Sequence, residues 1–274
     1  MFTRILSIFT ISGLIFPIQG AVRFPLTPSV DAWVYRYVPK SFDYYWDYGV
    51  RLHIDLIQIG DLGGFGSLLY RSTAGYDAMQ TVTHFDPIYA FYHQAIGIEY
   101  RHWGATGFVA VHRDCLHDID RESHLSEFWT TVRFGLGNCN PYRESIWRGS
   151  GYQKQGRDEA RPSIYFLYCG WGGPTLSPNL MATLKENNSY KGEIAGMLGM
   201  VGTYQGWVST IQGFARLQWS DLPLSPHHEI NMRLELGREG SVGSIRLVYS
   251  RLFRDTRPIR PADQKGYWGF RFVL

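Results

Sequence analysis

The sequence predicts an all-β fold, namely one antiparallel, up-and-down transmembrane β-barrel of about twelve strands. Three observations predict it. Segments with alternating apolar and polar residues recur along the chain, each about as long as a tilted strand that crosses a bilayer. Tight glycine-bearing turns alternate with longer polar connections. The composition, with 16% aromatic residues and 30 glycines, is typical of strands and turns.

The first predicted element is a signal peptide over residues 1–20. Arg4 precedes an uncharged apolar run over 5–18, and the small residues Gly20 and Ala21 follow it, which is the layout of a secretory signal. The run is too short to predict a spanning helix. We therefore expect an exported chain with a single barrel domain over 21–274. The mean hydropathy of −0.20 agrees with this fold because half of each barrel strand faces a polar lumen.

Residues 49–56 and 228–236 show the clearest alternation, with aliphatic residues at every second position and polar or charged residues between them. Charged side chains in this pattern cannot fill a dry core unpaired, but they can line a polar lumen while the other face meets lipid. A soluble sheet is the alternative. It does not explain why so many strands share this pattern although no helix is predicted to cover them. The predicted lumen-facing residues are Arg51, His53, Asp55, Glu127, Arg133, Glu229, Arg233 and Glu235.

The remaining strands and their connections follow the same rhythm. Further strands are predicted at 30–38, 64–73, 88–102, 105–113, 124–136, 163–171, 191–203, 206–220, 242–254 and 267–274. Tight turns are predicted at 60–63, 103–105, 203–206 and 237–240, and longer connections at 39–48, 74–87, 114–123, 172–190, 221–227 and 255–266. Segment 137–162 breaks the alternation, because it is long and polar where a tight turn is due. It is either an excursion outside the barrel or a missed pair of short strands.

The last strand places Trp268, Phe270, Phe272 and Leu274 on one face. It resembles the closing strand of Gram-negative outer-membrane β-barrel proteins, which alternates apolar and aromatic residues up to a final aromatic residue. This chain departs from that pattern at its final residue, Leu274. The resemblance implies a location in the bacterial outer membrane. It implies that the tight turns and both termini lie on the periplasmic side. It also implies outer-membrane lipid and the barrel assembly machinery as partners. The alternative is an edge strand of a soluble β-sandwich.

Segment 112–124 is the densest cluster of imidazole and carboxylate side chains. Its spacing matches no named zinc or EF-hand motif, but these groups are ligands for divalent cations. The alternative is a polar loop in which Arg113 and Arg121 neutralise the carboxylates. The candidate metal ligands are His112, His117, Asp118 and Asp120. No other cofactor is expected.

The same segment resembles the outer-membrane phospholipases and lipid A deacylases, which place a His and a Ser two positions apart on a barrel strand. Here Asp114 stands two positions after His112, and Ser123 is adjacent to His124, so the catalytic pair is missing. The segment is also similar to uncharacterised outer-membrane proteins with closely spaced His and Asp/Glu after a strand, which implies no activity.

No catalytic residue is therefore expected. The favoured function is a non-enzymatic barrel, meaning a narrow channel, a transport protein or a surface structural protein. The alternative is a barrel-embedded lipid hydrolase. The net charge of +3 without a Lys/Arg-rich block gives no indication of nucleic-acid binding.

The three cysteines are Cys115, Cys139 and Cys169. An exported chain can oxidise one pair of them. The predicted topology puts Cys115 and Cys169 at the outer ends of their strands and Cys139 on the opposite side. Cys115–Cys169 is thus the disulfide that this topology allows, and three unpaired thiols are the alternative.

Overall fold

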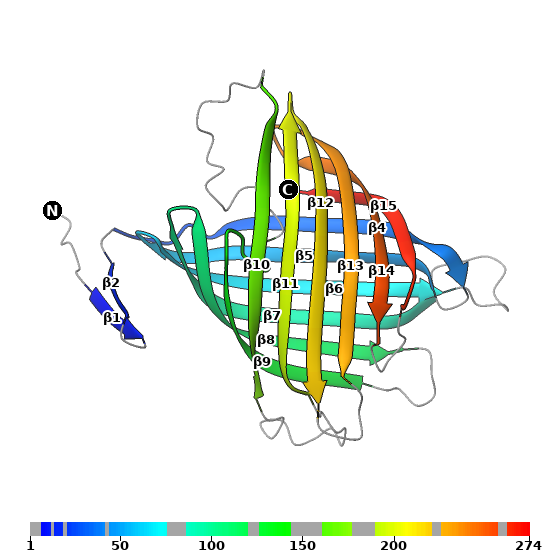
Figure 1. The fold of residues 1–274 in the computed structure, drawn as a ribbon, viewed down its shortest axis with the longest axis horizontal. Helices are drawn as coiled ribbons and strands as arrows, with labels where there is room; N and C mark the ends of the chain where they lie inside the picture. Colours follow the sequence, from blue (N-terminus) through cyan, green and yellow to red (C-terminus); the bar gives the residue numbers. More distant parts are fainter. Residues whose placement is uncertain are drawn as a thin grey trace.

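The protein is a closed antiparallel barrel of twelve strands, β4 to β15, in the computed structural model (Figure 1). The structure describes residues 7–11, 14–18, 21–41, 44–75, 86–119, 126–143, 161–176, 190–220, 226–256 and 262–274. Within these ranges, no helix is long and apolar enough to cross a membrane. The predicted fold class is confirmed.

Each barrel strand pairs with the next strand in the sequence, and β15 pairs with β4 to close the ring. The strands are β4 (Thr27–Ser41), β5 (Tyr44–Ile59), β6 (Leu62–Gly75), β7 (Asp86–His102), β8 (Ala105–Asp118), β9 (Ser126–Gly137), β10 (Ser163–Leu176), β11 (Tyr190–Tyr204), β12 (Trp207–Ser220), β13 (His227–Glu239), β14 (Ser244–Asp255) and β15 (Gly266–Val273). Every predicted strand overlaps one of them.

One predicted connection is wrong. The β4–β5 ladder runs as far as the pair Ser41 and Tyr44, so these strands are joined by a short hairpin and not by a long connection over 39–48. The aromatic-rich start of β5 extends the ladder by five residues beyond the predicted strand.

The N-terminal residues form three further strands. β1 (Ser7–Ile11) and β2 (Leu14–Ile18) pair with each other in a separate two-stranded sheet. β3 (Val22–Arg23) adds to the barrel by pairing with Gln58 and Ile59 of β5. The signal peptide over residues 1–20 stays a prediction.

The two rims of the barrel differ in their connections. One rim, called here the short-turn end, carries the tight turns between β5 and β6, β7 and β8, β11 and β12, and β13 and β14. Gly60, Gly104 and Gly206 adopt positive φ angles in these turns, a conformation that favours glycine. Val30 and Leu274 exchange backbone hydrogen bonds of 3.1 and 2.8 Å at the same rim, so both ends of the barrel domain lie there.

The outer surface of the barrel is apolar. Phe134, Ile194, Leu247 and Phe270 are among the large exposed apolar side chains of the strands, and exposure alternates residue by residue along β14. An apolar belt that surrounds a barrel with charged residues inside is the arrangement of a transmembrane β-barrel.

Aromatic side chains are exposed near both ends of this belt. Trp103 and Trp207 lie at the short-turn end, and Trp219 lies near the opposite end of β12. Aromatic residues at these two levels are typical of the girdles that sit at the interfaces of a bilayer.

Candidate functional site: the barrel interior

The barrel encloses a cavity of about 300 Å³. Five of the predicted lumen residues line it, namely Arg51, Arg133, Glu229, Arg233 and Glu235. His53 and Asp55 lie on β5 nearer the short-turn end, where the buried His53 ring stacks on Phe65 at a centroid distance of 5.6 Å. The side chain of Glu127 lies outside the described residues. The interior charges form networks that cross several strands.

The first network surrounds Glu235 near the short-turn end. Its carboxylate accepts from Arg271 at 2.6 Å and from Arg246 at 3.0 Å, and it pairs with Arg233 at 2.8 Å. Arg271 also donates to Asp31 at 2.7 Å. Because these residues come from β4, β13, β14 and β15, the network stabilises the closure of the barrel, where β15 pairs with β4.

The second network surrounds Asp47, near the end of β5 that is opposite the short-turn end. Arg71 and Tyr37 donate to one carboxylate oxygen at 2.6 and 3.0 Å, and Trp33 donates to the other at 2.8 Å. A buried carboxylate is stable only when its oxygens are paired and hydrogen-bonded, and Asp47 meets this requirement.

The third network runs around the opposite wall. Arg133 on β9 donates to Glu193 on β11, and Gln218 donates to the same carboxylate at 3.3 Å. His227 contacts Gln218 at 2.7 Å and Asp255 at 3.3 Å. Asp255 in turn accepts from the backbone of Ala262 at 2.9 Å. Polar contacts therefore link strands β9, β11, β12, β13 and β14 inside the barrel.

Residues 138–143, which follow β9, fold into the barrel from the short-turn end. This stretch is named here the inner segment. Asn138 exchanges hydrogen bonds with the backbone of β10 at Tyr168, and Asn140 donates to Glu99 at 2.8 Å. Arg143 donates to Asp55 and to Glu99. The start of segment 137–162 is therefore neither an excursion nor a strand pair, and residues 144–160 lie outside the described ones.

Tyr142 carries the inner segment into the middle of the barrel. Its ring packs on Phe65 and Phe108 at centroid distances of 5.3 and 5.7 Å. Its hydroxyl lies 3.2 Å from Nδ1 of His112 and 3.5 Å from the Arg133 guanidinium. Burial raises the pKa of Tyr142 to about 12, so the phenol stays protonated at neutral pH.

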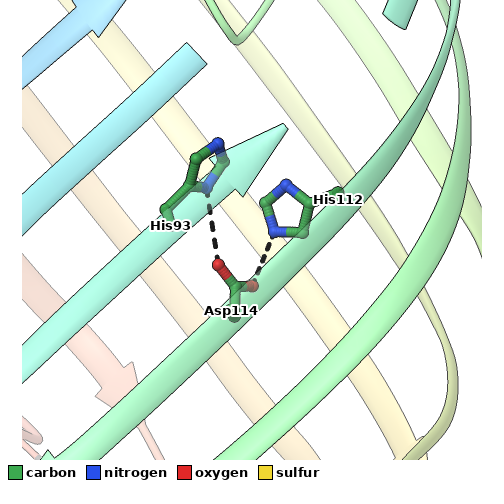
Figure 2. A group of neighbouring side chains, drawn as sticks. All are labelled: His93, His112 and Asp114. Carbon is green, nitrogen blue, oxygen red and sulfur yellow. Dashed lines mark ion pairs between the residues drawn. The ribbon is translucent and has the colours of Figure 1, made fainter. Parts of the chain in front are cut away.

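His93, His112 and Asp114, called here the His–Asp cluster, form a compact group on the cavity wall (Figure 2). Nε2 of His112 lies 2.7 Å from one Asp114 oxygen, and Nδ1 of His93 lies 3.4 Å from the other. Arg133 lies behind the cluster, 2.7 Å from Nδ1 of His112 and 3.5 Å from Asp114. Two imidazoles and a carboxylate can hold a proton or a divalent metal ion.

The structure separates the two predicted metal ligands whose side chains it describes, His112 and His117. His112 is buried inside the barrel, whereas His117, five positions later on β8, contacts Cys115 at 2.9 Å and the exposed Tyr92 on the outer face. Positions an odd number apart on a strand face opposite ways. The side chain of Asp118 and all of Asp120 lie outside the described residues. The sequence analysis missed His93, which joins His112 only through the β7–β8 register.

The cysteine topology predicted from the sequence is wrong. Cys169 is buried in the middle of β10 and Cys115 lies on β8, with β9 between the two strands. Cys139, expected on the opposite side, instead belongs to the same buried cluster as Cys169, and its thiol donates to the backbone carbonyl of Tyr168 at 3.7 Å. The β9–β10 register is the reason, because it pairs Cys169 with Gly137, two residues before Cys139. All three cysteines are free thiols in the structure.

No family model and no curated protein matches the chain. The chain is similar to the solved structure of Pseudomonas aeruginosa OpdK with vanillate, at 9% sequence identity and a TM-score of 0.28, over 90% of this chain and 96% of that chain. At so low a TM-score, the functional conclusion depends on the geometry of the barrel itself.

Proposed function

We propose that this protein is a narrow channel of the bacterial outer membrane whose short-turn end is closed by the inner segment. The apolar exterior supports a place in lipid, and the charged, cavity-containing interior supports passage of a polar solute. The tight turns at the rim where β4 begins and β15 ends support a periplasmic position for that rim.

The attachment of the inner segment to the barrel wall is the observation that carries this proposal. Asn140 and Arg143 contact the carboxylates of Asp55 and Glu99, and Tyr142 fills the space above them between Phe65 and Phe108. A barrel with a purely structural role needs its charges paired, but it has no need of a separate segment that blocks one end of an internal cavity.

Single-channel recording in a planar bilayer tests the proposal. The double variant Asn140→Ala with Arg143→Ala removes the polar contacts of the inner segment, and we expect its unit conductance to exceed that of the wild type several-fold. Arg238→Ala, an exposed arginine at the same end of β13, is the matched control and should conduct like the wild type.

Two results would count against the channel. One is the absence of conductance steps in both the wild type and the double variant, although both run as folded, heat-modifiable species on gels. The other is lipid hydrolysis by the purified wild type in a phospholipase assay, which would favour the enzymatic alternative.

A further inference from the structure

We infer that the His–Asp cluster binds one divalent transition-metal ion, with Zn²⁺ as its representative, inside the barrel. Imidazole and carboxylate are ligands that zinc accepts, and three protein ligands with one open position are typical of zinc sites that also bind a water or a solute. Nothing in the proposed channel function requires this metal, so the two proposals stand or fall separately.

The backbone holds the three side chains on one face of adjacent strands. His112 and Asp114 occupy alternate positions of β8, and His93 on β7 is the direct cross-strand partner of Asp114. The potential ligand atoms all lie within 4.8 Å of one another. The hydrogen-bonded ladder fixes the backbone positions of the three ligands, and burial restricts the side chains of His112 and Asp114 before an ion enters.

The polar atoms of the cluster are paired with one another but not fully satisfied by hydrogen bonds. Nε2 of His112 and both oxygens of Asp114 are buried and make no hydrogen bond of acceptable geometry, although their ion-pair distances are as short as 2.7 Å. Nε2 of His93 is also without a partner. Buried polar atoms without a hydrogen-bond partner are often explained by a bound ion or water. Figure 2 shows both imidazole rings turned towards the carboxylate.

Arg133 is the group that opposes a cation here, since its guanidinium lies 3.5 Å from Asp114. Its charge is already compensated on the other side by the buried carboxylate of Glu193. Asp114 therefore keeps its negative charge for an ion that enters from the cavity. All three ligands line that cavity, which provides the path to the site.

Tyr142 supports the metal-bound form of His112. When Nε2 binds the ion, the neutral ring carries its proton on Nδ1, so the Arg133 guanidinium that lies 2.7 Å from Nδ1 in the structure must turn towards Glu193, which leaves the Tyr142 hydroxyl, 3.2 Å away, as the partner of Nδ1. The hydroxyl oxygen then accepts this hydrogen bond and fixes the tautomer, as outer partners of metal-bound histidines usually do. Tyr142 is thus a positioning residue, and the metal site is linked to the inner segment.

Calorimetric titration of the folded protein in detergent with ZnCl₂ tests the inference. We expect one zinc ion per chain. His93→Ala and His112→Ala should each weaken binding by more than ~100-fold, and Tyr142→Phe by roughly 10-fold, because removal of an outer partner costs less than removal of a ligand. His117→Ala, on the outer face of the same strand, is the control and should leave the affinity unchanged.

X-ray absorption at the zinc edge of the wild type keeps the inference testable if a variant does not fold. We expect only nitrogen and oxygen ligands, at about 2.0–2.2 Å, and no sulfur at about 2.3 Å. A sulfur shell, loss of binding in His117→Ala, unchanged binding in His112→Ala, or no heat at sub-millimolar zinc would each overturn the assignment.

Discussion

Arg143 donates to both carboxylate oxygens of Asp55, which lies 88 positions earlier in the chain. The same guanidinium reaches Glu99, whose side chain is 1% exposed. A planar guanidinium matches a carboxylate at two points at once, so one side chain ties the inner segment to both β5 and β7. The barrel and the segment that enters it are therefore stabilised by the same contacts.

Replacing Arg143 with alanine is expected to lower the free energy of unfolding by about 3 kcal/mol, because it leaves a buried carboxylate with fewer partners. Urea titration in lipid vesicles, followed by tryptophan fluorescence, measures this loss. Arg238→Ala is the control, and its exposed position predicts a change within about 0.5 kcal/mol. Equal stability of the two variants would mean that the Arg143 contacts contribute nothing to the fold.

Replacing Glu235 with glutamine is expected to prevent assembly or to cost about 3–5 kcal/mol. The substitution removes the carboxylate charge that Arg233, Arg246 and Arg271 share, and an uncompensated buried charge is strongly destabilising. Glu229→Gln is the matched control, since its pair with Arg216 is partly exposed and predicts a cost of at most about 1 kcal/mol. Heat-modifiable gel mobility and urea titration report both effects, and similar values for both variants would contradict the network.

After export, Cys139 and Cys169 are expected to form a disulfide, because they lie in one buried cluster, with Cys169 paired to Gly137 two residues before Cys139, and exported proteins meet oxidising conditions. The bond would anchor the inner segment to β10. Peptide mapping of the protein from membranes without reductant should link these two residues and leave Cys115 alkylated. A link from Cys115 to Cys139 or Cys169 would contradict the strand positions. Three alkylated cysteines would show that the thiols of Cys139 and Cys169 stay reduced.

The strands were predictable because their signal is local. A period of two, interrupted by glycine-bearing turns, shows in the sequence wherever one face meets lipid and the other a polar interior. The start of β5 was missed because residues 44–47 lack that alternation. Only their backbone pairing with β4 shows that they belong to a strand.

The interior was less predictable because it depends on register. His93 meets Asp114 only because these positions are opposed across β7 and β8, and a shift by one residue would place His93 on the outer face. The inner segment is a tertiary feature, since its polar residues find their partners on strands far away in the sequence. A polar segment at a rim where tight turns are expected is the one sequence signal that marked it.

Arginine substitutions along the outer face of β15 test the membrane position of the barrel. Phe270 and Phe272 are both exposed on this face, and Phe272 lies closer to the short-turn end. Because a lipid-facing cation costs about 2–4 kcal/mol at the bilayer midplane and about 0–1 kcal/mol near the interface, Phe270→Arg should destabilise the folded barrel more than Phe272→Arg. Val242→Arg, in the exposed turn between β13 and β14, is the control and should change little. Urea titration in vesicles measures the series. Three equal costs, or stable folding of Phe270→Arg in water without lipid or detergent, would show that this face does not contact a membrane.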